Sequence, residues 1–254
     1  MRVLITRPRA QAEVFAAELA TLGVEAMVAP LIDIVPLPGP PLDLSGVQAL
    51  LVTSANGAST FAALSPERRL PMFAVGEETA AELRRLGFER VESASGDASD
   101  LAHLVASRLD SRAGVLLHPR GRDSRGGLAG LLRAGGYEVR ETVLYEARTV
   151  SAFGDDLKRT LREDGSLDTV LFFSPRTAEV FVRLALDANL GDACARLQAL
   201  CLSPAVATAA RALPWRAVRV AERPDRRGML DLVARTAESR RTIPRGTNPS
   251  RTGP

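Results

Sequence analysis

The chain of 254 residues contains one strand–turn–helix pattern twice. The segment QALLVTSANGASTF at residues 48–61 reappears as DTVLFFSPRTAEVF at residues 168–181. Ser54 corresponds to Ser174 and Phe61 to Phe181, so the offset is constant. In each copy an apolar run ends in a serine-containing turn that opens a helical pattern. A chain that repeats such a unit is restricted to α/β folds.

The repeat extends beyond this pair. MFAVGEETAAEL at residues 72–83 matches ALCLSPAVATAA at residues 199–210, and VLITRP at residues 3–8 is echoed by VLLHPR at residues 115–120. The last two segments each lead through a helical pattern to a further strand, near residues 27–34 and 139–145. Each half is therefore a series of βα units, which predicts two open, mostly parallel sheets with helices on both faces. The repeat is far too long for a solenoid and indicates a duplicated domain.

Two segments have the composition of linkers. They are the proline-rich VPLPGPP at residues 35–41 and the stretch at residues 149–155. The pattern alone leaves two topologies open, either tandem domains or one domain inserted into the other. In the inserted case, two antiparallel strands near residues 33–37 and 145–150 would connect the domains.

Composition limits the class of protein. Apolar residues make up 46% of the chain, which is enough for two cores. We expect a cytoplasmic protein without a membrane segment, because no apolar run is long enough to span a bilayer and a strand pattern begins at the N-terminus. Cys194 and Cys201 have no metal-ligand spacing, so we expect two buried or half-buried free thiols.

The net charge of +3 comes from the C-terminal end. Residues 239–254 contain four arginines, no acidic residue and several Pro and Gly, which predicts a disordered basic tail. The remaining residues carry near-equal numbers of basic and acidic side chains. We expect no nucleic-acid partner, because no basic face with interleaved aromatic residues is evident. A monomer is the expected state.

Several catalytic motifs are absent from the sequence. No G-x-G-x-x-G, Walker-type or G-x-S-x-G motif follows a strand pattern. His103 and His118 have no triad spacing; His103 fits a helix surface, whereas His118 precedes Pro-Arg-Gly at a strand end, where a role facing a ligand is open. Carboxylates do not cluster at strand ends. We therefore expect neither a metal nor another cofactor.

The predicted strand ends are small and polar. In open α/β sheets ligands bind at the carboxyl ends of the strands, and the first N–H groups of the following helices attract anions. Such ends in both halves predict one ligand with several carboxylates, bound by both domains. The alternative is that these residues only cap helices. The strand ends are Thr6-Arg7, Thr53-Ser54, Gly76 to Thr79, His118 to Gly121, Ser174 to Thr177, and Ser203.

These motifs, taken in order, resemble the uroporphyrinogen-III synthase family. The resemblance rests on LITRP at residues 4–8, TSANG at 53–57, FAVGEETA at 73–80, Leu144-Tyr145, LFFSPR at 171–176 and AERPD at 221–225, and it covers residues 1 to about 236. It implies two flavodoxin-like parallel-sheet lobes joined by a two-stranded connection, with the second lobe inserted in the first. The first lobe would comprise residues 1–36 plus 151–238, the second residues 39–147, and residues 239–254 would form the tail.

The resemblance also implies an activity. The family cyclises hydroxymethylbilane, a linear tetrapyrrole with eight carboxylates, to uroporphyrinogen III with inversion of ring D and loss of water. This is a hydro-lyase reaction of haem biosynthesis. Because the azafulvene intermediate is intrinsically reactive, the enzyme acts chiefly by positioning it. The expected partners are the small-molecule substrate and, in a transient hand-over, the upstream bilane-forming enzyme.

The resemblance assigns roles to individual residues. Tyr145 matches a tyrosine proposed as the acid that assists loss of the hydroxyl group. Thr53, Ser54 and Thr79 match substrate-binding positions on the second lobe, and Ser174 and Arg176 match positions on the first. We add Arg7 and Arg120 as carboxylate partners, because a guanidinium group binds carboxylates in a bidentate manner. The predicted substrate-binding set is completed by Asn56, Gly76, Gly121 and Ser203.

The sequence departs from the family pattern at one turn, and two alternative functions are considered. The turn SPAV at residues 203–206 lacks hydroxyl groups that some family members carry there. The main alternative to the enzyme is a non-catalytic, two-lobed tetrapyrrole- or anion-binding regulatory relative. A signalling receiver domain is disfavoured, because an acidic pocket is missing and the lone lysine, Lys158, belongs to a helix near the linker.

Overall fold

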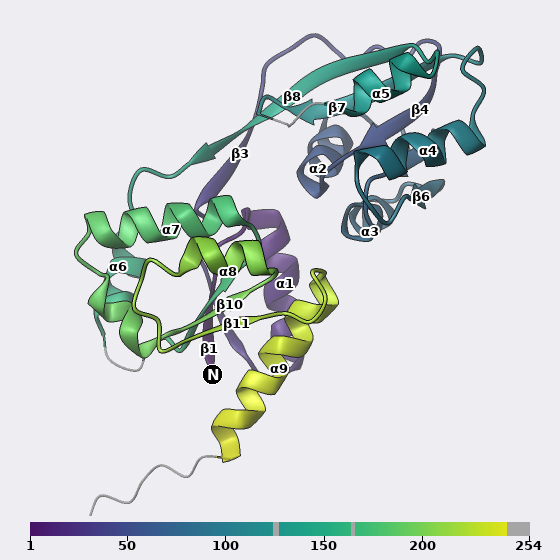
Figure 1. Ribbon diagram of the computed structural model, residues 1–254. Helices are drawn as coiled ribbons and strands as arrows, with labels where there is room; N and C mark the ends of the chain where they lie inside the picture. The colour runs from purple at the N-terminus through teal and green to yellow at the C-terminus, as the bar shows by residue number, and fades with distance from the viewer. Residues whose placement is uncertain (124–126, 164–165, 243–254) are drawn as a thin grey trace, which may run out of the picture. The chain divides into compact units, whose positions relative to one another are not determined.

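The computed structural model describes residues 1–123, 127–163 and 166–242 (Figure 1). The chain divides into two compact units: unit 1 comprises Met1–Asp33 and Thr149–Pro254, and unit 2 comprises Ile34–Arg148. Unit 2 is thus inserted into unit 1, which decides between the two topologies that the sequence left open.

Unit 1 is built on a parallel five-stranded sheet in the order β11-β10-β9-β1-β2. Its strands are β1 (Arg2–Ile5), β2 (Glu25–Val28), β9 (Thr169–Phe172), β10 (Gln198–Cys201) and β11 (Ala217–Val220). Its helices are α1 (Arg9–Thr21), α6 (Asp155–Arg162), α7 (Pro175–Asp187), the 3-10 helix η1 (Asp192–Arg196), α8 (Pro204–Ala210) and α9 (Arg226–Thr242).

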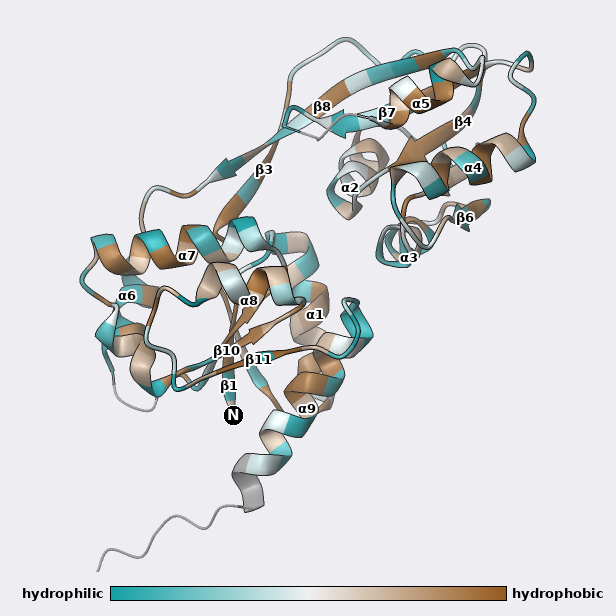
Figure 2. Ribbon diagram, viewed as in Figure 1, coloured by the Kyte–Doolittle hydropathy of each residue, from teal (hydrophilic) through white to brown (hydrophobic). Residues whose placement is uncertain are grey.

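Helices cover both faces of this sheet because successive strand residues point to opposite sides. Val3 and Ile5 pack in one core with buried residues of α1 and α9. Leu4, between them, packs in the other core with residues of α6, α7 and α8. Strand β10 is correspondingly hydrophobic (brown in Figure 2) and fully buried. Burial on both faces explains why the strands of the sequence appear as continuous apolar runs.

Unit 2 contains a six-stranded sheet in the order β3-β8-β7-β4-β5-β6. Helices α2 and α3 pack on one face and α4 and α5 on the other. Its strands are β3 (Ile32–Pro36), β4 (Val47–Val52), β5 (Met72–Ala74), β6 (Val91–Ser93), β7 (Val115–Gly121) and β8 (Val139–Thr149). Its helices are α2 (Ala55–Leu64), α3 (Glu77–Arg85), α4 (Ala98–Arg108) and α5 (Leu128–Ala134).

The two sheets are copies of one another, as the sequence repeat predicts. Without β3, the order β6-β5-β4-β7-β8 matches β11-β10-β9-β1-β2 strand for strand. The chain enters the two copies at different points. Numbered along the chain, the strands of unit 1 lie in the flavodoxin order 2-1-3-4-5, whereas the corresponding five of unit 2 lie in the order 3-2-1-4-5. The second copy is therefore a circular rearrangement of the first.

The chain passes between the units within two neighbouring strands. The boundary at Asp33 falls inside β3 and the boundary at Arg148 inside β8. The amide of Leu37 donates to the carbonyl of Leu144 at 2.8 Å, and the amide of Val150 to that of Leu31 at 3.1 Å. Residue numbers rise on one strand as they fall on the other, so the two strands run antiparallel.

The end of the chain differs from the predicted tail. Helix α9 continues to Thr242, so residues 239–242 are helical and the helix does not stop at residue 238. The helix forms because Met229, Leu232 and Val233 recur at helical spacing and are buried in the core of unit 1. The rest of the predicted tail, residues 243–254, lies outside the described residues.

The two cysteines are both buried, at η1 and at the end of β10. Burial raises the pKa of each thiol, Cys194 and Cys201, to about 12.

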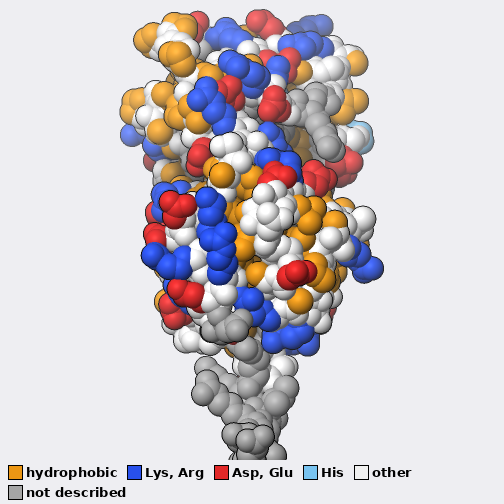
Figure 3. All heavy atoms as spheres, turned by 90° about the vertical axis from the view of Figure 1, so that its left-hand side faces the viewer, with side chains coloured by type: hydrophobic (Ala, Val, Ile, Leu, Met, Phe, Trp, Pro, Cys, Tyr) orange, Lys and Arg blue, Asp and Glu red, His pale blue; other side chains and the backbone are white. Residues whose placement is uncertain are grey.

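Positive and negative side chains are interspersed over the face seen in Figure 3. Among the described helices, none combines the length and the apolar character needed to cross a membrane.

Candidate functional site

Each sheet contains one pair of neighbouring strands whose following helices lead to strands on opposite sides of the pair. In unit 2, β4 leads through α2 to β5 on one side, while β7 leads through α5 to β8 on the other. In unit 1 the equivalent pair is β9 and β1. Crevices at the carboxyl ends of such strand pairs are the usual ligand sites of open α/β sheets. Most of the predicted site residues lie at these strand ends.

Tyr145 and Ser54 meet at this point of unit 2, although 91 residues separate them. The phenol oxygen of Tyr145, on β8, lies 3.0 Å from Oγ of Ser54, which immediately precedes α2. Ser54 is the N-cap of α2, and its Oγ also accepts a hydrogen bond from the amide of Gly57 at 3.1 Å. Tyr145 is only 7% exposed. Burial raises the pKa of its phenol, and the hydrogen bond with Ser54 opposes part of that rise.

A register shift in the sheet places the Tyr145 ring. Arg120 of β7 pairs with Val143 of β8, but the next residue, Gly121, pairs with Tyr145, so Leu144 is an extra residue of the bulge type. As a result Leu144 and Tyr145 both pack in the core beneath α2 and α3. Gly121, predicted to bind substrate, lies directly against the ring: a Cβ atom there would be 2.8 Å from Cε2 of Tyr145.

Thr53 is held by a histidine that the predicted site set did not include. The Nε2 atom of His118 lies 3.4 Å from Oγ1 of Thr53. His118 is only 5% exposed, and within the described part of the chain its Nδ1 atom has no hydrogen-bond partner. Burial is the main cause that lowers the pKa of the imidazole; nearby Glu141 opposes this and Arg120 adds to it. His118 is thus buried behind Thr53.

Arg120 already has a carboxylate partner. Its Nε atom lies 3.1 Å from Oε1 of Glu141 on β8, and the other oxygen of that carboxylate lies 3.3 Å from Nη2 of Arg133. The side chain of Arg120 is one-quarter exposed. A substrate carboxylate would therefore compete with Glu141 for this guanidinium group.

The other predicted residues of unit 2 lie at the starts of α2 and α3. Asn56, in the first turn of α2, is half-buried. Gly76 is the N-cap of α3, and a Cβ atom there would meet nothing within 4 Å, so this turn is open. Thr79 is buried in the first turn of α3, at 6% exposed.

In unit 1 the predicted serines are helix caps. Oγ of Ser174 accepts from the amide of Thr177 at 3.2 Å and lies 2.7 Å from Oγ1 of the same residue. Oγ of Ser203 accepts from the amide of Val206 at 3.4 Å. The capping interpretation therefore holds for Ser54, Ser174 and Ser203. Each serine oxygen accepts a hydrogen bond from one backbone N–H at the start of its helix, and each serine is half-buried.

The two predicted arginines of unit 1 are arranged differently. Arg7 donates through Nη2 to Oε1 of Gln11 at 2.8 Å, and its guanidinium carbon lies 4.5 Å from the centre of the Phe173 ring. Arg176, in the first turn of α7, is exposed. Arg7 and Ser174 follow the adjacent strands β1 and β9, which places them at the same edge of the sheet.

The structure thus brings Tyr145, Ser54 and Gly121 into contact and leaves Thr79 buried. The Thr53–His118 and Arg120–Glu141 pairs could not be predicted from the sequence, because each joins different strands or turns. His118 stood out only by its place at a strand end. In the described ranges, no group of three or more His, Cys, Asp or Glu residues is arranged to hold a metal ion.

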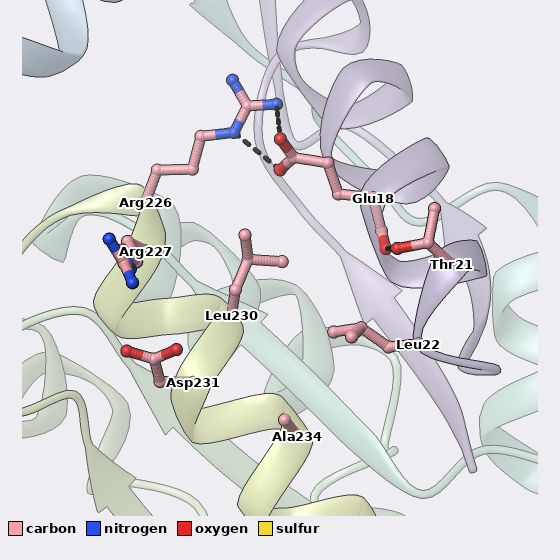
Figure 4. A pocket seen from close by; sticks show the side chains of 8 residues that line it. All are labelled: Glu18, Thr21, Leu22, Arg226, Arg227, Leu230, Asp231 and Ala234. Atoms are coloured by element: carbon pink, nitrogen blue, oxygen red, sulfur yellow. Dashed lines mark hydrogen bonds and ion pairs between the residues drawn. The ribbon is translucent and has the colours of Figure 1, made fainter.

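A separate groove of about 530 Å³ lies between α1 and α9 (Figure 4). Glu18 and Arg226 form a two-fold ion pair beside it, with both N–O distances 2.7 Å. Leu22 and Leu230 supply apolar surface. None of the predicted site residues lines this groove, so it is distinct from the candidate site.

The fold and the strand-end residues define a class: a duplicated, doubly wound α/β protein with a hydrogen-bonded tyrosine–serine pair at the switch point of its inserted unit. The family model described as "Uroporphyrinogen-III synthase HemD" matches residues 13–231. The chain belongs to the uroporphyrinogen-III synthase family, which confirms the resemblance seen in its motifs.

Individual relatives agree with this assignment. The uroporphyrinogen-III synthase of Chlorobaculum parvum is 28% identical over 202 residues, which is 75% of this chain and 81% of the relative. The uroporphyrinogen-III synthetase of Helicobacter pylori superimposes with a TM-score of 0.57 at 17% identity, covering 93% of this chain and 100% of the other. A mutant uroporphyrinogen III synthase of Thermus thermophilus gives a TM-score of 0.50 at 22% identity, with 94% and 99% covered. Both solved structures share the fold of this chain.

The family is one of lyases in porphyrin and haem biosynthesis, so the predicted enzyme class is confirmed. These comparisons give no support to the alternative of a non-catalytic binding relative.

Proposed function

We propose that this chain cyclises hydroxymethylbilane to uroporphyrinogen III, with inversion of ring D and loss of water. The observation that carries the proposal is the Ser54–Tyr145 pair, a phenol 3.0 Å from a serine hydroxyl at the switch point of unit 2, in a chain that matches the family over residues 13–231. Two further features support it: half-buried hydroxyl groups at strand ends of both units and arginines at several of the same ends.

In this proposal Tyr145 gives its proton to the departing hydroxyl group of the substrate. The raised pKa keeps the phenol protonated at neutral pH, as an acid must be. A phenol is a weak acid at this pH, so the larger share of catalysis falls to positioning the reactive chain end. Direct substrate binding by Thr53, Asn56, Gly76, Ser174 and Ser203 is part of the proposal, whereas Ser54, Thr79 and Gly121 are proposed to contribute indirectly.

The arginines would bind substrate carboxylates. Arg7 and Arg176 in unit 1 and Arg120 in unit 2 each offer a guanidinium fork that suits a carboxylate. A substrate with eight carboxylates can engage several of them. For Gly121 and Thr79 the geometry supports an indirect contribution: Gly121 makes room for the Tyr145 ring, and Thr79 is buried at the start of α3.

The test is an isomer assay. Freshly generated hydroxymethylbilane is mixed with the protein, and the oxidised products are separated. The expected result is mostly isomer III, formed faster than the spontaneous product. Isomer I alone, from protein shown to be folded by circular dichroism, would overturn the proposal and favour a non-catalytic tetrapyrrole-binding protein.

We also propose that the protein acts as a cytoplasmic monomer that receives its substrate by transient hand-over. Among the described residues, the exposed large hydrophobic side chains come one each from α2, α5, α7, β8 and the end of α1. Scattered residues of this kind do not form an association patch. Size-exclusion chromatography with light scattering tests the monomer, and channelling of substrate in a coupled assay with the bilane-forming enzyme tests the hand-over.

A further inference from the structure

The Ser54 hydroxyl has a defined set of hydrogen-bonding roles. A serine hydroxyl has one proton to donate and two lone pairs that accept. The amide of Gly57, 3.1 Å away, can only donate, so Ser54 must accept from it. The other hydrogen-bond partner of Ser54 Oγ in the described part of the chain is the phenol oxygen of Tyr145, at 3.0 Å.

Two arrangements of the Ser54–Tyr145 bond are conceivable, and they have opposite consequences. If Tyr145 donates to Ser54, the phenol proton is bound within the protein and the serine proton has no protein acceptor among the described residues. If Ser54 donates to Tyr145, its proton is satisfied and the phenol proton is left for another acceptor. Each arrangement leaves one hydroxyl proton without an acceptor among the described residues, and only the second leaves that proton on the phenol, where a substrate can accept it.

We propose that Ser54 is a positioning residue that donates its hydrogen bond to the Tyr145 phenol oxygen, links that oxygen to the start of helix α2, and leaves the phenol proton for the substrate. The inference rests on the proposed function, since it assigns Tyr145 its acid role. The chain of bonds runs from the Gly57 amide to Ser54 Oγ and from the Ser54 hydroxyl to Tyr145.

The link matters when the proton leaves. The C–O bond of the substrate's hydroxymethyl group breaks with its electron pair going to oxygen, and the phenol proton completes a water molecule. The substrate is left as a protonated azafulvene and Tyr145 as a phenolate. Ser54 then donates to an anion, and the positive end of the ten-residue helix α2 lies behind it. The substituted α-carbon of ring D attacks the azafulvene first and has no proton to lose. Its older bond to the neighbouring methylene group then breaks, and the unsubstituted α-carbon of ring D closes the macrocycle. The proton lost from this last carbon restores the phenol.

The first test measures Tyr145 directly and without substrate. Tyr137 and Tyr145 are the two tyrosines of the chain, so a Tyr137→Phe background leaves Tyr145 as the one ionising phenol. Ultraviolet titration is expected to show that Tyr145 ionises at a higher pH in the Tyr137→Phe, Ser54→Ala double variant than in Tyr137→Phe alone, by about one pH unit. Ser54→Thr keeps the hydroxyl group and is expected to restore the midpoint. Far-ultraviolet circular dichroism, followed in parallel, shows whether the fold persists through the titration.

The second test is kinetic. Ser54→Ala is expected to lower kcat about ten-fold with little change in KM, and adding it to Tyr145→Phe is expected to cause no further loss of kcat. Because Ser54 also caps α2, Asp97→Ala is the matched control: it removes the cap of α4 in the same unit, far from the candidate residues in sequence. This control is expected to leave kcat and the Tyr145 midpoint unchanged.

Failure of the inference and failure of the proposed function are distinguishable. An unchanged Tyr145 midpoint in Ser54→Ala, or fully additive losses of kcat in the double variant, would overturn the positioning role even if the protein makes isomer III. If the protein unfolds before Tyr145 ionises, the double-variant comparison decides. A raised midpoint in a protein that makes only isomer I would keep the Ser54–Tyr145 link and refute the proposed activity.

Discussion

The ring of Tyr145 packs against the backbone at Gly121, so closely that a Cβ atom on Gly121 would lie 2.8 Å from Cε2 and 2.9 Å from Cζ. Real Cβ atoms do not approach carbon atoms this closely, and the neighbours of the ring are core side chains. The glycine is therefore a requirement for the position of the phenol.

We expect Gly121→Ala to displace the Tyr145 ring. The activity should fall about as far as in Tyr145→Phe, and overpacking should cost about 1–3 kcal/mol of stability. Product-isomer rates and thermal unfolding measure the two effects. Gly130→Ala in helix α5 is the control, because a Cβ atom there meets nothing within 4 Å; a Gly121→Ala enzyme as active as this control would contradict the requirement.

Tyr145→Phe should retain the fold and lose about ten- to one-hundred-fold in kcat, which corresponds to about 1.4–2.7 kcal/mol of barrier. The phenyl ring fills the same space, so the change removes the acidic proton and the hydrogen bond with Ser54 alone. Steady-state assays of isomer III formation give the result. Wild-type kcat in this variant would remove Tyr145 from the chemistry.

Arg120 and Glu141 should change KM in opposite directions. Arg120→Gln removes a guanidinium group that we propose for a substrate carboxylate, and KM should rise by about ten-fold. Glu141→Gln removes the competing carboxylate 3.1 Å from Arg120, and KM should fall by about two- to five-fold. Arg140→Gln, next to Glu141 on β8, controls for a general loss of positive charge. Equal KM values in all three variants would exclude Arg120 from binding.

The buried His118 should make the fold sensitive to acid. Its pKa is lowered from 6.5, mainly by burial, so the unfolded chain takes up a proton at a higher pH than the folded one. This contribution to the free energy of unfolding is fully present above pH 6.5 and is lost as pH falls through the lowered pKa. Urea unfolding at pH 7.5 and 5.5 should show a smaller decrease for His118→Gln than for the parent, by at most about 1.4 kcal/mol. As a control, His103→Gln, which replaces an exposed histidine, should show the same decrease in the free energy of unfolding as the parent.

Cys194 and Cys201 should be inert in the folded protein. Both are buried, and their pKa values of about 12 leave almost no thiolate at pH 8. A chromogenic disulfide reagent should therefore titrate no thiol in native buffer and two in denaturant. One fast-reacting thiol under native conditions would show local opening at η1 or β10.

The parts of the structure that could be predicted are those that local patterns encode. The apolar runs at residues 49–52 and 170–173, each followed by a serine turn, predicted β4 and β9 and their helices, because buried parallel strands and helix caps leave local signals. Helix α9 beyond residue 238 was not predicted, since arginines and a threonine also suit a disordered segment.

The contacts of the candidate site were harder to predict. The Ser54–Tyr145 bond depends on the order of the strands and on the extra residue at Leu144, and neither follows from spacing in the chain. The same holds for His118 behind Thr53 and for Glu141 beside Arg120. The position of these residues at strand ends could be predicted from the sequence, but their pairing could not, because pairing is set by sheet register.

The insertion of unit 2 within unit 1 has a consequence for the order of folding. Strand β1 must pair with β9, and Val3 lies opposite Thr169, so this contact closes a loop that contains all of unit 2. Pairing of β3 with β8 brings Leu31 beside Val150 and shortens that loop, and each halving of loop length is worth about 0.6 kcal/mol. During synthesis the inserted unit emerges complete while the outer one still lacks β9, β10 and β11. Strands β1 and β2 therefore cannot complete their sheet until β9 has been synthesised. Folding of the inserted unit first brings the two parts of the outer unit close together and lowers the entropic cost of pairing them.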